Sequence, residues 1–272
     1  MKTKLFLLLP FLIFTAATYA QTVEQEEGEI KIKHAEPVFN DFNTDLGANK
    51  GESNANVNFG YQRTRNNHHE LISQLEIELA PANNFGLELL LPYNAYFNNA
   101  GSMVQRPENR LEFLQWSAQY TLYQAPAKGI SMALGFSNTF ESQSPEPQLN
   151  SNRRWSLQSV YFYTFGTFAK NWNDRYFFVF SGGPEPERNL EDQEWALGAR
   201  LNAAFHYGFS ENDHYLGVEL NQVISDGSTE LYIRPQVILD LGEKFELGVA
   251  AGVPIVVEDT RWSLFGRLSY KF

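Results

Sequence analysis

The carboxyl-terminal stretch of the chain decides the fold, and it reads Trp262-Ser263-Leu264-Phe265-Gly266-Arg267-Leu268-Ser269-Tyr270-Lys271-Phe272. Every second position of this stretch is apolar or small, and four of the five positions between them are polar. Successive side chains of a β-strand point to opposite faces of the sheet. A period of two therefore predicts a strand with one apolar face and one polar face.

The last residue is aromatic, Phe272, and Tyr270 and Leu268 precede it at the same spacing. This ending resembles the assembly signal of bacterial outer-membrane β-barrels, whose last strand is recognised by the barrel-assembly machinery. The resemblance implies that Leu268, Tyr270 and Phe272 form this signal and that the assembly machinery is a partner. A soluble strand can end in the same way, so a secreted β-sandwich or a soluble barrel is the alternative.

The composition narrows the class of protein. The chain has 272 residues, 43% of them hydrophobic, with 22 Phe and 13 Tyr. A mean hydropathy of -0.36 excludes a bundle of membrane helices but allows a β-barrel, which shows only every second side chain to lipid. The chain has no Cys, which excludes disulfides, thiolate metal sites and a cysteine nucleophile. Its net charge of -11 argues against nucleic acid as a partner.

The first 20 residues read as a secretory signal peptide. Lys2 and Lys4 supply positive charge, residues 5–14 form a short apolar core, and Thr18 and Ala20 place small residues at the cleavage positions. The core is shorter than the roughly 20 residues that a membrane-spanning helix needs. We therefore expect export, cleavage before Gln21, and a final location in the bacterial outer membrane.

From residue 54 onward, apolar and polar residues alternate through about twelve segments. In residues 70–79, for example, Leu75 and Ile77 fall on one face, and Glu76 and Glu78 fall on the other. Many segments have the length of about 9–11 residues with which a tilted strand crosses the hydrocarbon core. This length favours a membrane barrel over a soluble sandwich.

The connections between these segments sort into two classes. Tight turns follow the even-numbered segments, and longer polar loops follow the third, fifth and seventh, at residues 98–110, 142–154 and 182–193. Long loops at one end only are typical of outer-membrane barrels. An open edge in lipid would leave backbone groups unpaired, so the sheet must close. We predict an all-β fold over residues 54–272, a single closed antiparallel transmembrane β-barrel of about twelve strands.

An opening segment, residues 21–53, precedes the predicted barrel and contains two motifs, residues 34–41 and 45–52. They resemble the HAEPLYID family of bacterial proteins, whose members place them just ahead of a predicted outer-membrane barrel. The resemblance covers roughly residues 34–97, and the first motif departs from the family at Val38, Phe39 and Asn40. The matching motif residues are His34, Ala35, Glu36, Pro37, Asp41, Asp45, Leu46, Gly47, Lys50, Gly51 and Glu52.

The resemblance implies no activity and assigns no catalytic residue. It leaves two places open for the short segment ahead of the barrel. The segment either enters the lumen as a plug or packs under the periplasmic mouth.

A search for catalytic or metal-binding residues finds no established motif. His68 and His69 are adjacent on a predicted strand, so their side chains point to opposite faces and are not expected to share a metal. Outer-membrane phospholipases use a Ser–His–Asn set, and no matching sequence is present. His206 is the residue that could serve as a base, and the alternative is that it caps a hydrogen-bond network in the lumen. We expect no enzyme activity, no metal and no cofactor.

The polar faces of the strands point into the lumen of the predicted barrel. Our lumen or selectivity candidates on these faces are Glu76, Glu78, Glu88, Glu112, Arg200, His206, Arg234, Asp240 and Arg267. Carboxylates and arginines that face one another can form a charged constriction that selects solutes. The alternative is a network of salt bridges that fills a small barrel and leaves no pore.

These patterns support three functional hypotheses. The first is a channel or transporter for small hydrophilic solutes, embedded in outer-membrane lipid. The second is a structural barrel without a pore, whose long loops bind an external partner. The third is an outer-membrane lipid hydrolase, which would use His206.

Overall fold

A computed structural model describes residues 31–40, 46–64, 68–98, 109–143, 156–210, 213–225, 227–256 and 260–272. The predicted signal peptide and most of the first two predicted loops lie outside these ranges. Residues 32–272 form one unit. The described ranges contain one short 3-10 helix, η1 (Pro126–Lys128), and no helix long and apolar enough to cross a membrane.

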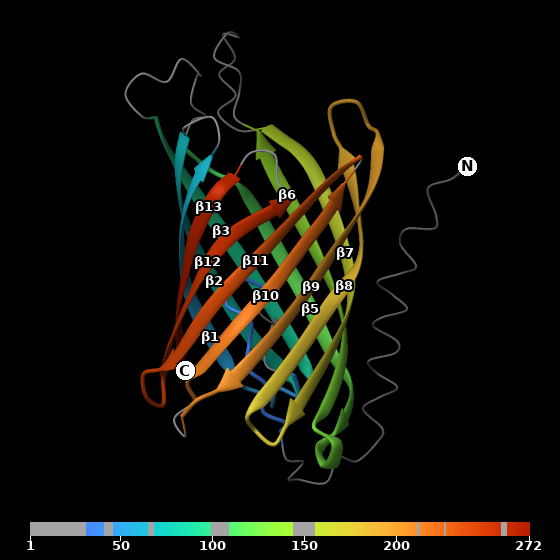
Figure 1. The fold of residues 1–272 in the computed structure, drawn as a ribbon. Coiled ribbons are helices and arrows are strands. Elements are labelled where there is room, and N and C mark those ends of the chain that lie inside the picture. Colours follow the sequence, from blue (N-terminus) through green and yellow to red (C-terminus); the bar gives the residue numbers. More distant parts are fainter. Residues whose placement is uncertain are drawn as a thin grey trace, which may run out of the picture. The chain divides into compact units, whose positions relative to one another are not determined.

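Thirteen antiparallel strands make up the described fold (Figure 1). They are β1 (Ser53–Thr64), β2 (His68–Ala82), β3 (Phe85–Asn98), β4 (Arg110–Leu111), β5 (Phe113–Ala125), β6 (Ile130–Gln143), β7 (Ser156–Trp172), β8 (Tyr176–Asn189), β9 (Trp195–Gly208), β10 (Tyr215–Ser225), β11 (Ser228–Asp240), β12 (Phe245–Val256) and β13 (Thr260–Lys271). Consecutive strands pair except β4 and β5, β3 also pairs with β5, and β1 pairs with β13, so the sheet closes on itself. The predicted barrel of about twelve strands is confirmed, with the two-residue β4 as an extra strand.

The carboxyl-terminal stretch forms β13, the strand that closes the barrel. β13 pairs on one side with β12 and on the other with β1, where Asn54 lies opposite Lys271 and Tyr61 lies opposite Leu264. Beyond this ladder, Phe272 N donates to Ser53 O (3.1 Å). Closure pairs the backbone groups that an open sheet would leave without partners in hydrocarbon.

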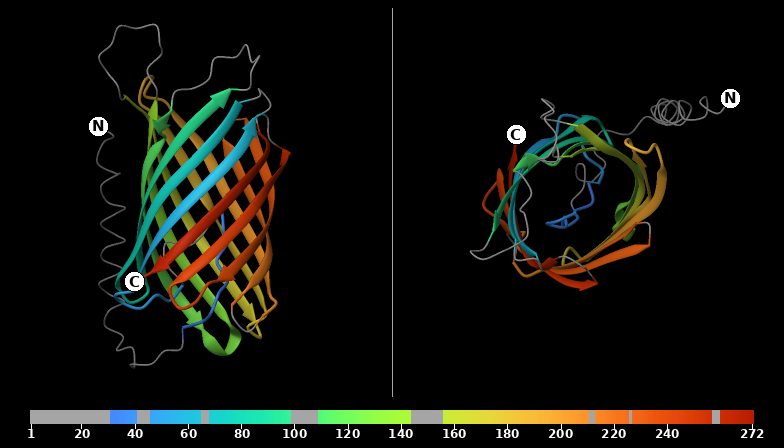
Figure 2. Two further views of the ribbon diagram at one scale, coloured as in Figure 1. Left: turned by 90° about the vertical axis from the view of Figure 1, so that its left-hand side faces the viewer. Right: turned by 90° about the horizontal axis from the view of Figure 1, so that it is seen from above.

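The two faces of the tilted wall have opposite character (Figure 2). Val57 and Leu75 point outward and are 51% and 46% exposed, whereas Glu76 and Glu78 point inward and are 3% and 1% exposed. An apolar outer face and a polar inner face suit a barrel in lipid. The predicted orientation of the alternating faces is therefore confirmed.

One predicted loop is wrong. The sequence predicts a long loop over residues 182–193, but β8 continues to Asn189 and residues 190–194 connect it to β9. The glycines and prolines of residues 182–186 are types that usually interrupt strands. In the structure these residues keep their register with β9, and only the pairing with β7 is interrupted, between Gly182 and Glu187.

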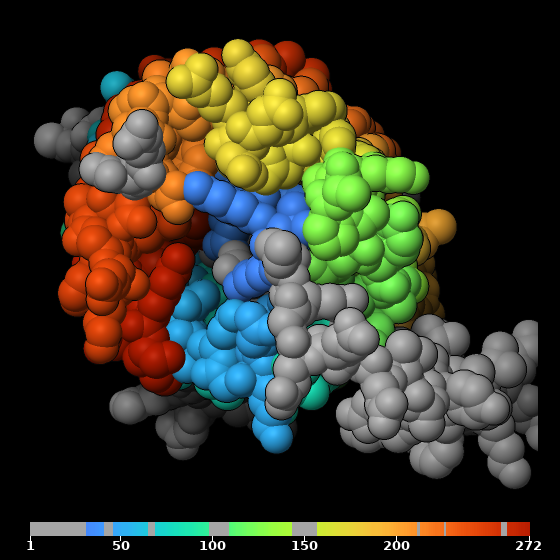
Figure 3. All heavy atoms as spheres, turned by 90° about the horizontal axis from the view of Figure 1, so that it is seen from below, coloured from blue at the N-terminus to red at the C-terminus, as the bar shows by residue number. Residues whose placement is uncertain are grey.

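The described part of the opening segment lies inside the barrel. Residues 32–40, drawn in blue, run within the ring of strands when the molecule is seen along its axis (Figure 2). They also lie between the strands in the view from below (Figure 3). The short helix η1, which joins β5 to β6, lies at the lower end of the barrel in Figure 1. We call residues 32–40 the inner segment.

Candidate functional site

Polar side chains of several strands hold the inner segment. Val38 N donates to Gln236 Oε1 on β11 (2.8 Å), and Phe39 N donates to Glu219 Oε2 on β10 (3.2 Å). Near the start of the segment, His34 Nε2 lies 2.9 Å from Ser131 Oγ on β6. The inner segment is neither helix nor strand, so its backbone groups need partners of this kind when they are buried.

Arg267, on β13, binds the same segment and is only 1% exposed. Its Nη1 donates to Pro37 O (3.2 Å). Its Nη2 lies 3.2 Å from Glu246 Oε1 on β12 and 3.7 Å from Glu36 Oε2. One guanidinium therefore joins two carboxylates and a carbonyl, and these partners offset the cost of burying its charge.

A small apolar core accompanies these polar contacts. It contains Ala35 and Val38 of the inner segment, with Phe177, Tyr215, Ile238, Ala250 and Phe265 from the strands. Gly248 on β12 makes room for this packing, because a Cβ atom there would lie 2.8 Å from a methyl carbon of Val38. The apolar residue on the inner face of β13, Phe265, is explained by this core.

Arg234 and His206 lie close to the inner segment. The Arg234 guanidinium carbon is 3.6 Å from the centre of the Phe39 ring and 4.3 Å from that of Tyr232, which are cation–π contacts. His206 is fully buried, and its Nε2 lies 2.8 Å from Nε2 of Gln236, which also holds the inner segment. Because an amide nitrogen only donates, the histidine Nε2 accepts.

The described part of the second family motif, residues 46–52, leads into β1. Leu46 is buried in a cluster with Ala133, Ala169 and Val179. Gly47 has a φ of 83°, in the left-handed region that favours glycine. Gly51 N donates to Ala80 O at the end of β2 (2.8 Å). Residues 41–45, which include two aspartates of the motifs, lie outside the described ranges.

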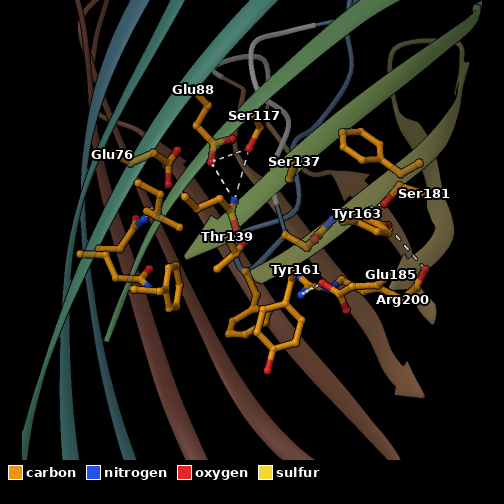
Figure 4. A pocket seen from close by; sticks show the side chains of 18 of the residues that line it. Glu76, Glu88, Ser117, Ser137, Thr139, Tyr161, Tyr163, Ser181, Glu185 and Arg200 are labelled. Carbon is orange, nitrogen blue, oxygen red and sulfur yellow. Dashed lines mark hydrogen bonds and ion pairs between the residues drawn. The ribbon is translucent and has the colours of Figure 1, made fainter. Parts of the chain in front are cut away.

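The lumen also contains a cavity of about 440 Å³ (Figure 4). Its charged lining residues are Glu76, Glu88, Glu112, Glu141, Glu185 and Arg200. In Figure 4, Glu76 and Glu88 lie on one side of the cavity, and Tyr163, Glu185 and Arg200 lie on the other. The volume falls in the range of small-molecule sites, about 300–1,000 Å³.

The structure divides the sequence candidates into three groups. Four of them, Glu76, Glu88, Glu112 and Arg200, line the cavity. Three others, His206, Arg234 and Arg267, lie around the inner segment, as described above. Glu78 is buried and accepts a hydrogen bond from Asn56 Nδ2 (2.5 Å), and Asp240 Oδ1 accepts one from Gly242 N (2.7 Å) in a turn.

Several residues that line the cavity were not predicted from the sequence. The aromatic residues Tyr161, Tyr163 and Phe165 line the cavity, but β7 carries aromatic residues on both faces, so alternation does not show which face is inward. The polar residues Ser159 and Thr167 were the available signal for the inward face. Both have odd numbers, as Tyr161, Tyr163 and Phe165 do, and both are buried in the structure. Glu185 was missed because it belongs to the stretch predicted as a loop.

A closed antiparallel barrel with an apolar exterior and a polar lumen defines the class of outer-membrane β-barrels. The HAEPLYID-like family model matches residues 30–271, and the chain belongs to this family. The match extends far beyond the residues on which the sequence resemblance rests. The search of curated proteins found no match.

Solved outer-membrane proteins share the fold. The crystal structure of the COG4313 outer membrane channel from Pseudomonas putida F1 aligns with a TM-score of 0.64 and 12% identity, over 84% of this chain and 98% of that chain. The KdgM porin aligns with a TM-score of 0.52 and 15% identity, over 80% and 99%. The KdgM porin in complex with disordered oligogalacturonate aligns with a TM-score of 0.53 and 16% identity, over 80% and 99%. At these identities the likeness is one of fold.

Proposed function

We propose that the protein is an outer-membrane channel for small hydrophilic solutes, narrowed by its inner segment. The observation that carries this proposal is the polar cavity inside the closed barrel, lined both by strands and by Phe39 and Asn40 of the inner segment. A lumen filled by salt bridges alone would leave no such space. The fold shared with a channel and a porin supports the same function.

The charges of the cavity favour cations as the solutes. Five of its lining residues are carboxylates and one is an arginine, and that arginine, Arg200, is paired with Glu185. Carboxylates that line a pore select cations over anions. We therefore expect the open channel to conduct cations better than anions.

The proposal assigns no catalytic reaction to the protein. His206 is the base that a lipid hydrolase would use, and it is buried behind Gln236 and does not line the cavity. A general base must come within hydrogen-bond reach of its nucleophile and substrate. This position disfavours the hydrolase hypothesis.

Single-channel recording in planar lipid bilayers tests the proposal. We expect small conductance steps from the wild-type protein, and a reversal potential in a salt gradient that shows preference for cations. Gly248→Val places a side chain against Val38 and should displace the inner segment, so its steps should be larger than those of the wild type. Gly166→Val is the matched control, because a Cβ there finds its nearest neighbour at an ordinary 3.8 Å.

The recordings also have an outcome that contradicts the proposal. If neither the wild type nor Gly248→Val conducts, although both fold and insert, the lumen is closed. The protein would then be a structural or surface-binding barrel.

A further inference from the structure

Three residues that line the cavity each have a buried polar atom without a hydrogen-bond partner within the described part of the protein. Two of these atoms are acceptors, Oδ1 of Asn58 on β1 and Oγ1 of Thr167 on β7, whose residues are 3% and 4% exposed, and the third is a donor, Nε of Arg200 on β9. Buried polar atoms in folded proteins are almost always paired. Because the residues of the three unpaired atoms line the cavity, a bound molecule can supply the missing hydrogen-bond partner once the side chain turns toward it.

Asn58 and Glu76 form a polar wall of the cavity. Asn58 Nδ2 donates to Glu76 Oε2 (2.9 Å), and Asn56 Nδ2 donates to Glu76 Oε1 (2.6 Å). These amide donors are neutral and do not cancel the carboxylate charge. Asn58 Oδ1 adds a second acceptor beside that charge. A primary ammonium carries a positive charge and three donors, and so it matches this wall.

Aromatic rings form the wall across from Glu76 (Figure 4). The rings of Tyr163 and Phe165 are stacked, with their centres 5.0 Å apart and their planes at 23°. The Phe165 ring lies over Gly135 on β6, where a Cβ atom would come within 2.1 Å of the ring. The glycine lets the Phe165 ring lie along the wall with Tyr163 stacked beside it, and an aromatic body in the cavity can pack against these two rings edge to face.

The cavity offers an anion a single guanidinium. Arg200 is the one arginine among the lining residues, its Nη2 forms an ion pair with Glu185, and its buried Nε has no partner among the described residues. Its guanidinium carbon also lies 5.2 Å from the centre of the Tyr163 ring. An anion at Nη2 would have to displace Glu185, and an anion anywhere in the cavity would face the other carboxylates of the lining.

We propose that the cavity binds small organic cations in which a primary ammonium group is attached to an aromatic body. The ammonium lies at Glu76 and Asn58, the ring lies against Tyr163 and Phe165, and a ring hydroxyl reaches Thr167. This inference rests on the proposed function for the route by which the molecule enters, since it names the solute class of the same lumen. Binding itself does not require conduction.

Isothermal titration calorimetry on the purified, folded barrel in a non-ionic detergent tests the inference. The probes are phenethylamine, tyramine, 3-phenylpropionate and phenethyl alcohol, which share one ring and differ in charge or in the ring hydroxyl. We expect phenethylamine to bind at least about tenfold more tightly than the acid or the alcohol, as a charge-assisted hydrogen bond predicts. Tyramine should bind more tightly than phenethylamine.

Variants locate the binding within the cavity. Glu76→Gln should weaken phenethylamine binding by about tenfold or more, whereas Glu191→Gln, at an exposed loop carboxylate, should not change it. Thr167→Val should remove the advantage of tyramine over phenethylamine. If Glu76→Gln does not fold, Tyr163→Leu provides the second test and should weaken binding of both amines.

The outcomes separate this inference from the proposed function. Equal affinities for the amine, the acid and the alcohol would overturn the inference, and so would unchanged amine binding in folded Glu76→Gln or Tyr163→Leu. A protein that binds amines but does not conduct would overturn the channel function alone. A protein that conducts but does not bind amines would overturn the inference alone.

Discussion

Arg267 shows, at the scale of single residues, how the barrel wall and the inner segment depend on each other. Its buried guanidinium binds Pro37 and Glu36 of the inner segment and Glu246 of the neighbouring strand. A guanidinium suits this position because its five donors form a rigid fork, whereas a lysine would bring a point charge. The same side chain therefore belongs both to the strand that closes the barrel and to the binding of the segment inside it.

Arg267→Met should destabilise the folded protein by about 1–3 kcal/mol, because the carbonyl and the carboxylates would lose their shared donor. The measurement is the urea midpoint of the protein folded into lipid vesicles. Arg261→Met is the control, since Arg261 lies on the same strand and is exposed. An unchanged midpoint for Arg267→Met would show that these contacts contribute no net stability.

The sequence could predict the direction of Arg267 but not its partners. Alternation with Leu268 and Leu264 places Arg267 on the inner face of its strand, which the structure confirms. Its partner Pro37 precedes it by 230 residues, and no local pattern connects the two. Phe265 also has a distant partner in the inner segment. Its ring packs against that of Phe39, with 5.3 Å between the ring centres, and this contact explains an apolar residue on the polar face.

At the scale of elements, the ladder between β7 and β8 is interrupted in its middle. Leu190 N donates to Gln158 O on β7 (2.8 Å), so even-numbered residues of β8 direct their N–H groups toward β7. Pro184 and Pro186 share this numbering and have no N–H to donate. Pairing with β7 accordingly stops between Gly182 and Glu187, although the register on either side is the same.

The double variant Pro184→Ala/Pro186→Ala adds two donors to this ladder. We expect slower hydrogen exchange of the backbone amides in residues 162–165 of β7, because the restored bonds would reduce local opening. Mass spectrometry of the β7 peptide measures the change. Pro235→Ala on β11 is the matched control and should leave the β7 peptide unaffected. Unchanged exchange in the double variant would mean that the prolines do not cause the interruption.

The same ladder shows why one strand end was missed by the sequence reasoning. Local propensity treats Gly182, Gly183, Pro184 and Pro186 as loop residues, which they usually are. In the barrel, the intact pairing of β8 with β9 keeps these residues extended. In β8, pairing with the neighbouring strand overrides the local preference of the residues for a loop. In β2, local preference and strand pairing agree, and alternation places Glu76 correctly on the inner face.

At the scale of the whole molecule, closure between β1 and β13 joins the two ends of the barrel sequence. Every long strand then has two neighbours, and the apolar outer face is continuous around the wall. Pairing between strands about 200 residues apart has no local signal, so the sequence could imply closure only from the cost of an open edge in lipid.

A cysteine pair can test this closure directly, because the natural chain has no Cys to interfere. Gln62 and Ser263 lie opposite each other in the β1–β13 ladder, so Gln62→Cys/Ser263→Cys should form a disulfide on mild oxidation. The boiled, non-reduced protein should then migrate faster on a denaturing gel than the reduced one. Gln62→Cys/Ser269→Cys is the control, because Ser269 lies opposite Asn56, about 20 Å along the strand, too far for a bond. Equal cross-linking of the two pairs, or none in either, would contradict the register that closes the barrel.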